Sequence, residues 1–123
     1  MASKAEVSQR PRVELREVSG QTTIVTLVGE HDLSTKARLV EQFERARMAS
    51  IVIVDLTACT FIDSTIIAAI LAQRLARPRQ RVEIVLPPAG SEAHRALHIV
   101  AMPELIATYP TLERALARVQ PPR

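Results

Sequence analysis

The chain has 123 residues, a formal net charge of +3 and an apolar content of 47%, but aromatic residues make up only 2% of it. This length suits one domain whose core is built from Ile, Val, Leu and Ala. The single cysteine, Cys59, excludes an internal disulfide and a cysteine-rich metal site, and it is typical of a reducing cytosol. The apolar runs are too short for a membrane span, and the polar start is unlike a secretory signal, so we expect a cytoplasmic protein without membrane attachment.

Basic residues are spread along the chain, with one mild cluster at Arg74, Arg77, Arg79 and Arg81. A basic cluster indicates either a nucleic-acid contact or the solvated end of a helix. No aromatic residue interleaves this cluster and no recognition motif accompanies it, so we favour the helix end and expect no direct nucleic-acid binding.

The N-terminal third predicts a tail, a hairpin and a helix. Residues 1–11 are read as a tail. Strands are expected at 13–18 and 22–28, joined by a turn at Ser19–Gln21. Residues 29–32 end the second strand, and Ser34 or Thr35 can cap the helix that follows. Its apolar positions recur at helical spacing: Leu39, Val40, Phe43 and Ala46.

The middle of the chain predicts a strand, a helix and a second strand. Residues 51–56 are apolar except for Asp55, which indicates a central strand buried on both faces and parallel to a neighbour. A helix should begin near Ser64 and end before Pro78. Alternating residues at 81–86 predict the next strand, so the three elements form a right-handed crossover. The expected buried stripe of the helix is Ile66, Ile67, Ile70, Leu71 and Leu75.

The C-terminal third predicts two helices around a short strand. Ser91 can cap a helix that carries Ala93, Ala96, Leu97 and Val100. Pro103 marks a break, and residues 105–109 are compatible with a short edge strand. Thr111 caps a final helix, and residues 120–123 form a tail. We therefore expect one domain over residues 12–119.

Ser64 is the main candidate site, because it lies where a polar loop meets an apolar helix. The N–H groups and dipole of a helix start favour added negative charge. Two interpretations stand: Ser64 is the helix cap, or it is a reversible charge switch that accepts a phosphate. Asp63 is likewise either a cap or a partner contact.

Other reactive residues do not form a catalytic or metal-binding pattern. His94 and His98 are four residues apart, but no carboxylate or cysteine motif accompanies them. Cys59 has no neighbouring base in the sequence and is taken as a packing residue. The three glycines are isolated, and no serine hydrolase elbow occurs. We expect neither an enzyme nor a bound cofactor or metal.

Several blocks together resemble the STAS domain of bacterial anti-sigma factor antagonists. Gly29–Thr35 (GEHDLST) is similar to the family's segment before its first helix. Ile53–Ser64 (IVDLTACTFIDS) is similar to its strand and loop ending in Asp-Ser. Ala96–Met102 (ALHIVAM) and Tyr109–Leu116 (YPTLERAL) resemble its third and closing helices. The joint order of these blocks covers residues 13–118.

The resemblance implies an α/β fold, with a mixed sheet and about four helices packed mainly on one face. It also implies that Ser64 is phosphorylated by a serine kinase that is itself the anti-sigma factor, and that only the unphosphorylated form binds this partner and thereby regulates transcription. The alternative is a STAS scaffold or sensor that binds proteins or a small ligand without phosphorylation.

Two residues depart from the family pattern, and three others extend the candidate contact surface. The family has glycine where this chain has Ile66, which either narrows a kinase's approach or extends a contact surface; His31 replaces a leucine. Besides Asp63 and Ser64, partner contacts are expected from Thr65, Glu30 and Asp32. Packing at the helix start is the other role open to Thr65, and a turn-forming, solvated role is open to Glu30 and Asp32.

Overall fold

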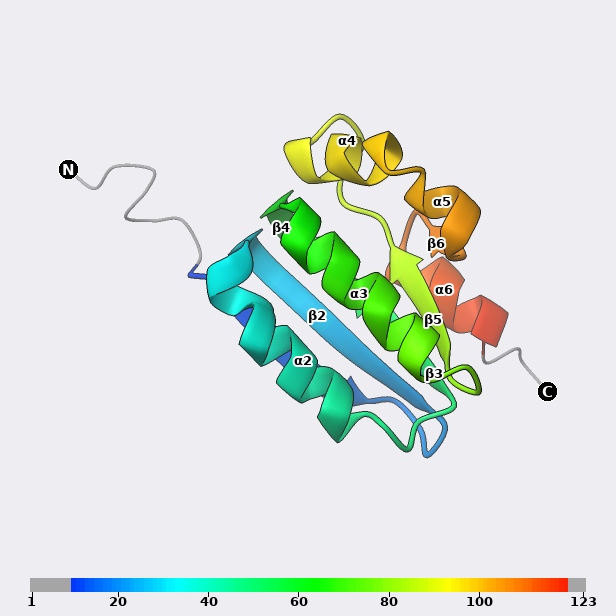
Figure 1. Cartoon of the computed structure of the whole chain (residues 1–123). Helices are drawn as coiled ribbons and strands as arrows, with labels where there is room; N and C mark the ends of the chain where they lie inside the picture. The colour runs from blue at the N-terminus through cyan, green and yellow to red at the C-terminus, as the bar shows by residue number, and fades with distance from the viewer. Residues whose placement is uncertain (1–9, 120–123) are drawn as a thin grey trace.

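The computed structural model describes residues 10–119, so the tails expected at 1–11 and 120–123 fall almost entirely outside the described residues (Figure 1). The sheet has six strands in the order β1-β2-β3-β5-β6, and β4 pairs with β2. The strands are β1 Arg12–Glu17, β2 Thr22–His31, β3 Ile51–Asp55, β4 Cys59–Ile62, β5 Arg81–Val85 and β6 Thr108–Tyr109. The helices are the 3-10 helix η1 Leu33–Thr35, α2 Lys36–Arg45, α3 Ser64–Ala76, α4 Glu92–Ile99, α5 Met102–Leu105 and α6 Leu112–Val119.

The pairing of the strands confirms the α/β prediction. β1 and β2 form the expected antiparallel hairpin, whereas β2–β3, β2–β4, β3–β5 and β5–β6 are parallel. All five residues of β3 are buried, as expected of a central strand. The parallel pairing of β3 with β5 confirms that a crossover containing α3 connects these two strands.

The core lies on both faces of the sheet, with the larger part under α2 and α3. These two helices run side by side across the sheet (Figure 1). Their buried side chains include Leu39, Phe43, Ile66 and Ile70, and each such burial stabilises the fold by roughly 1.5–3 kcal/mol. On the opposite face, α6 packs through Ala115. The helices therefore lie mainly on one face, as predicted.

Three local predictions were wrong. Leu75 is exposed rather than buried, because it lies five residues after Ile70, about 140° around an ideal helix from it. Pro103 lies in the first turn of the short helix α5, after Met102, where its missing N–H costs nothing. The edge strand expected over 105–109 contains only Thr108 and Tyr109.

The polar loop expected before Ser64 contains a fourth strand. In β4, Cys59 and Ile62 are buried while Thr60 and Phe61 are exposed. β4 pairs with residues 29–31 at the end of β2, with a register shift between Gly29 and Glu30. The φ of Gly29, 89°, suits glycine. This short strand decides where Asp63 and Ser64 lie, because they follow it directly.

Candidate functional site

Ser64 is exposed at the first position of α3, and Asp63 rather than Ser64 caps the helix. The Asp63 Oδ1 accepts a hydrogen bond of 3.1 Å from the N–H of Ile66. Within residues 10–119 the Ser64 hydroxyl has no hydrogen-bond partner. The capping interpretation of Ser64 is therefore wrong, and its side chain is available to solvent.

The start of α3 also retains two unused backbone donors. Asp63 satisfies the N–H of Ile66 through its side chain, and its carbonyl accepts from Ile67 at 3.1 Å. The N–H groups of Ser64 and Thr65 have no acceptor among the described residues. Unpaired donors at the positive end of a 13-residue helix favour an anion beside Ser64.

A backbone hydrogen bond joins the start of α3 to the end of β2. The N–H of Asp63 donates to the His31 carbonyl at 3.2 Å. Glu30 is the Cα partner of Phe61 in the β2–β4 ladder. Both Glu30 and Asp32 are exposed. The predicted contact residues of the two segments therefore share one edge of the molecule.

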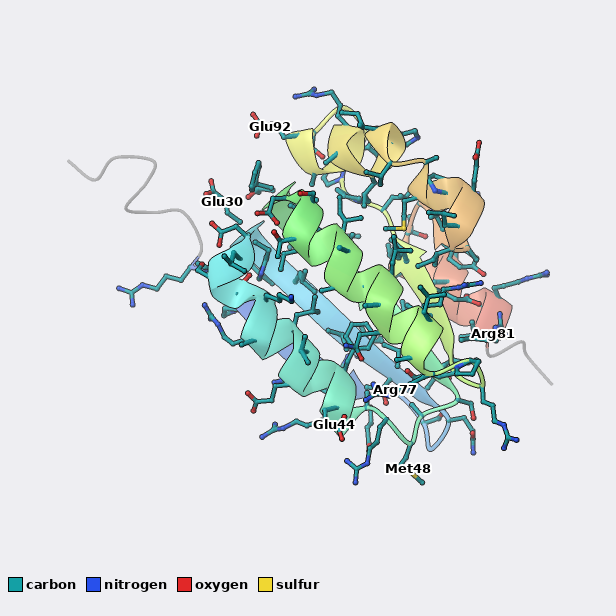
Figure 2. The ribbon with its side chains drawn as sticks, in the orientation of Figure 1. Glu30, Glu44, Met48, Arg77, Arg81 and Glu92 are labelled. Carbon is teal, nitrogen blue, oxygen red and sulfur yellow. The ribbon has the colours of Figure 1, made fainter. Side chains whose placement is uncertain are left out.

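This edge carries several acidic side chains. Figure 2 shows Glu30 beside the start of α3, with Glu92 of α4 at the same end of the molecule. Asp63 and Asp32 add two carboxylates from the adjoining helix starts. Among the described residues, no salt bridge joins these four carboxylates to a basic side chain. A phosphate on Ser64 would enlarge an excess of negative charge.

Asp32 caps the 3-10 helix η1, which corrects the expected cap at Ser34 or Thr35. Its Oδ1 accepts from the N–H of Ser34 at 2.9 Å and from the Ser34 hydroxyl at 2.6 Å. These hydrogen bonds lower the pKa of Asp32 below its usual value. Thr35 is the N-cap residue of α2 by position, but its side chain makes no capping hydrogen bond.

His31 is fully buried beneath this edge, and both of its ring nitrogens have partners. Nε2 lies 2.9 Å from the Val28 carbonyl, and Nδ1 lies 3.0 Å from the Thr35 hydroxyl. Burial lowers the pKa of His31, so the ring is neutral at pH 7. A carbonyl only accepts, so Nε2 donates to Val28. The single proton of the Thr35 hydroxyl serves either Nδ1 or the Asp32 carbonyl, which lies 3.1 Å from that hydroxyl. The ring thus holds the turn between β2 and η1.

Ile66, which replaces the family glycine, is fully buried in the core. Neither consequence expected from the sequence holds, because its side chain neither narrows the approach to Ser64 nor extends the surface. Thr65 is half-buried, whereas Ser64 next to it is exposed.

Two exposed apolar residues near the candidate site were missed by the sequence analysis. Leu33 in η1 and Phe61 in β4 are both exposed, and η1 and β4 adjoin the end of β2. The pattern buried, exposed, exposed, buried in β4 is too short to signal a strand. Together with the acidic groups they give this edge a mixed apolar and negative surface.

The remaining reactive side chains do not extend the site. Burial raises the pKa of the Cys59 thiol to about 11, and its Sγ lies 3.3 Å from the Phe61 carbonyl. The His94 and His98 rings lie 4.3 Å apart. Residues 10–119 contain no group of three His, Cys, Asp or Glu side chains placed to hold a metal ion. No helix in the same range is both long and apolar enough to cross a membrane.

Comparison with known proteins identifies the family. The STAS domain model matches residues 12–115. An anti-sigma factor antagonist from Mycobacterium paratuberculosis is 21% identical, with a TM-score of 0.80 over 90% of this chain and 95% of its own. The unphosphorylated form of the anti-sigma factor antagonist SpoIIAA is 18% identical, with a TM-score of 0.73 over 89% of this chain and 96% of its own. The phosphorylated form of the Bacillus cell fate determinant SpoIIAA is 18% identical, with a TM-score of 0.67 over 89% of this chain and 100% of its own.

A search of curated protein sequences gave no match. At these levels of identity the solved structures establish the fold, and the family model covers most of the sequence. The chain therefore belongs to the STAS domain family.

Proposed function

We propose that this protein is a cytoplasmic anti-sigma factor antagonist. It binds an anti-sigma factor through the edge around Ser64, and phosphorylation of Ser64 by a serine kinase ends that binding. The protein acts by binding rather than by catalysis, and it regulates transcription through the sigma factor that it releases. The observation that carries the proposal is the exposed Ser64 hydroxyl beside two unpaired N–H groups.

The electrostatics of the site favour a switch that acts on the partner. A phosphate adds about −1.5 to −2 charges at neutral pH. The free N–H groups of Ser64 and Thr65 can accommodate it, so the fold is retained. The neighbouring Asp63 makes the surface strongly negative once the phosphate is present. A partner that packs closely on the free hydroxyl would then face a desolvated dianion and dissociate.

The family relationship supports the same function. One structurally similar protein, SpoIIAA, is known in unphosphorylated and phosphorylated forms. The scaffold or sensor alternative depended on Ile66 obstructing or reshaping the site. Since that side chain lies in the core, Ile66 gives this alternative no support.

The test uses candidate anti-sigma kinases with ATP, followed by mass spectrometry to locate the phosphate. Labelling should occur on Ser64 and disappear in Ser64→Ala. Thr65→Val is the matched control, because it removes the adjacent, half-buried hydroxyl without changing volume, and it should keep the label. Ser64→Asp should weaken anti-sigma factor binding. Labelling that persists in Ser64→Ala would refute the assignment, and a chain that is neither labelled nor bound by any anti-sigma factor would favour the scaffold.

A further inference from the structure

A second surface lies at the opposite end of α3, where a groove of about 530 Å³ runs along the edge of β5. Helix α3 separates it from Ser64 by roughly 18 Å at 1.5 Å per residue. In Figure 2, Arg81 at the groove and Glu30 at the edge around Ser64 lie at opposite ends of the molecule. The groove is therefore independent of the proposed serine switch.

The backbone of β5 is only partly paired on this side. β6 pairs with Ile84 and Val85 alone, and the Ile84 N–H donates to the Ala107 carbonyl at 2.9 Å. Arg81 donates in the other direction, to the Ser50 carbonyl next to β3. Because donors alternate sides along a strand, the N–H and C=O of Val82 point toward the groove. Neither has a hydrogen-bond partner among the described residues.

The walls of the groove carry exposed apolar side chains and one unpaired cation. Leu75 of α3 is 74% exposed and Leu105 of α5 is 48% exposed. Arg74 lines the same groove and has no salt bridge within the described chain. Arg81 is bound to the buried carboxylate of Glu83, which neutralises both charges. The surplus charge at the groove is therefore positive.

A buried oxygen at the groove lacks a donor. Gln80 is fixed by its amide nitrogen, which donates to the Ala46 and Ala49 carbonyls at 2.9 Å each. Its Oε1 has no partner in the described residues. An unpaired acceptor and an open strand edge both favour a ligand that supplies N–H groups.

We propose that the open edge of β5 binds an extended segment of a partner protein as an added strand. The segment places an apolar side chain between Leu75 and Leu105 and a carboxylate beside Arg74, while its backbone pairs with Val82. Strand addition of this kind takes its affinity from main-chain hydrogen bonds and its specificity from alternate side chains. The surface leaves the Ser64 edge free for a second partner.

The test titrates the isotope-labelled full chain with the acetylated and amidated heptapeptide TVDVEVT, followed by NMR. Amide shifts should change at Val82, Leu105 and Ala107, and exchange of the Val82 amide should slow. The peptide TVKVKVT, with reversed charge, should bind roughly fivefold more weakly. Absence of these changes at peptide concentrations up to about 5 mM, or changes centred on Ser64, would overturn the proposal.

Matched surface variants separate the groove from general effects. Arg74→Glu should weaken TVDVEVT roughly fivefold, whereas Arg114→Glu, with the same charge change on α6, should not weaken it. Leu75→Ala should weaken peptide binding, whereas Ile99→Ala removes an exposed apolar side chain from α4 and should leave the binding unchanged. If a variant and its control changed the affinity for the peptide equally, the proposed binding site would be wrong. Sedimentation experiments test whether a second copy of the chain occupies the edge instead. A dimer in which exchange of the Val82 amide is already slow before peptide is added would refute the proposal of a partner segment.

Discussion

The N–H of Asp63 donates to the His31 carbonyl, so the residue that caps α3 is attached directly to the buried histidine at the end of β2. The Asp63 side chain binds Ile66 in the first turn of the helix. One residue therefore fixes Ser64 in two directions, toward the sheet and toward the helix. The positioning of the exposed hydroxyl depends on Asp63 and on the structure around His31.

Substitution of Asp63 should destabilise the fold more than substitution of Ser64. Asp63→Ala removes the α3 cap and should lower the free energy of unfolding by about 1 kcal/mol. Ser64→Ala removes a hydroxyl without a partner and should change it by less than about 0.5 kcal/mol. Urea unfolding followed by circular dichroism measures both values. Equal losses in the two variants would contradict the assignment of the cap.

The buried His31 should make stability fall in acid. Burial lowers the folded-state pKa of His31 below the usual histidine value of 6.5, so between these two pKa values the unfolded chain binds more protons than the folded chain. The contribution of neutral His31 to the free energy of unfolding is complete above pH 6.5 and is lost as pH falls through the folded-state pKa.

Urea unfolding at a series of pH values tests this expectation. The decline of the unfolding free energy below pH 6.5 should be shallower in His31→Leu, which cannot titrate. His98→Gln provides the matched control, because it removes a histidine from an exposed position of α4. A His31→Leu profile parallel to the wild-type profile would exclude His31 as the cause.

Strong periodicity made most of the fold predictable from the sequence, but the surroundings of the site depend on contacts between distant residues. The apolar run at 51–54 has few alternatives to a buried strand, and the hairpin has a clear turn signal. β4 has four residues, and it forms because β2 continues past Gly29 and offers an edge to pair with. Nothing local in the sequence gives that pairing.

The same limit applies to single residues of the site. Asp63 and Ser64 are both good capping residues, and only the position at which α3 begins decides between them. Asp32 is preferred over Ser34 as a cap because η1 starts at Leu33, two residues earlier than a helix capped by Ser34 would. His31 looked like an anomaly in a family motif, although it fills a buried position with both nitrogens bonded.

Cys59 should be inert in the folded protein. Burial raises the pKa of its thiol to about 11, so almost no thiolate is present at pH 8. Iodoacetamide should modify it only at the rate of unfolding, and the rate should rise steeply in urea. Rapid modification of the native chain without urea would show that the β4 region opens much more readily than its packing indicates.

Ile66 should contribute to stability and not to the proposed switch. Ile66→Gly restores the residue that the family has at this position, but it removes a fully buried side chain and adds glycine to a helix. The expected loss is about 4 kcal/mol. Ala68→Gly, at an exposed position of the same helix, should cost only about 1 kcal/mol and isolates the burial component.

The rate of Ser64 phosphorylation in Ile66→Gly shows whether residue 66 affects a kinase's access to Ser64 as well as the packing of the core. Because the Ile66 side chain does not reach the surface at Ser64, Ile66→Gly should be phosphorylated no faster than Ala68→Gly when the rates are compared per folded molecule. Mass spectrometry after timed incubation with the kinase measures the rates. A large acceleration confined to Ile66→Gly would mean that the branched residue restrains the backbone a kinase must bind. The glycine of other family members would then serve access to the serine rather than packing.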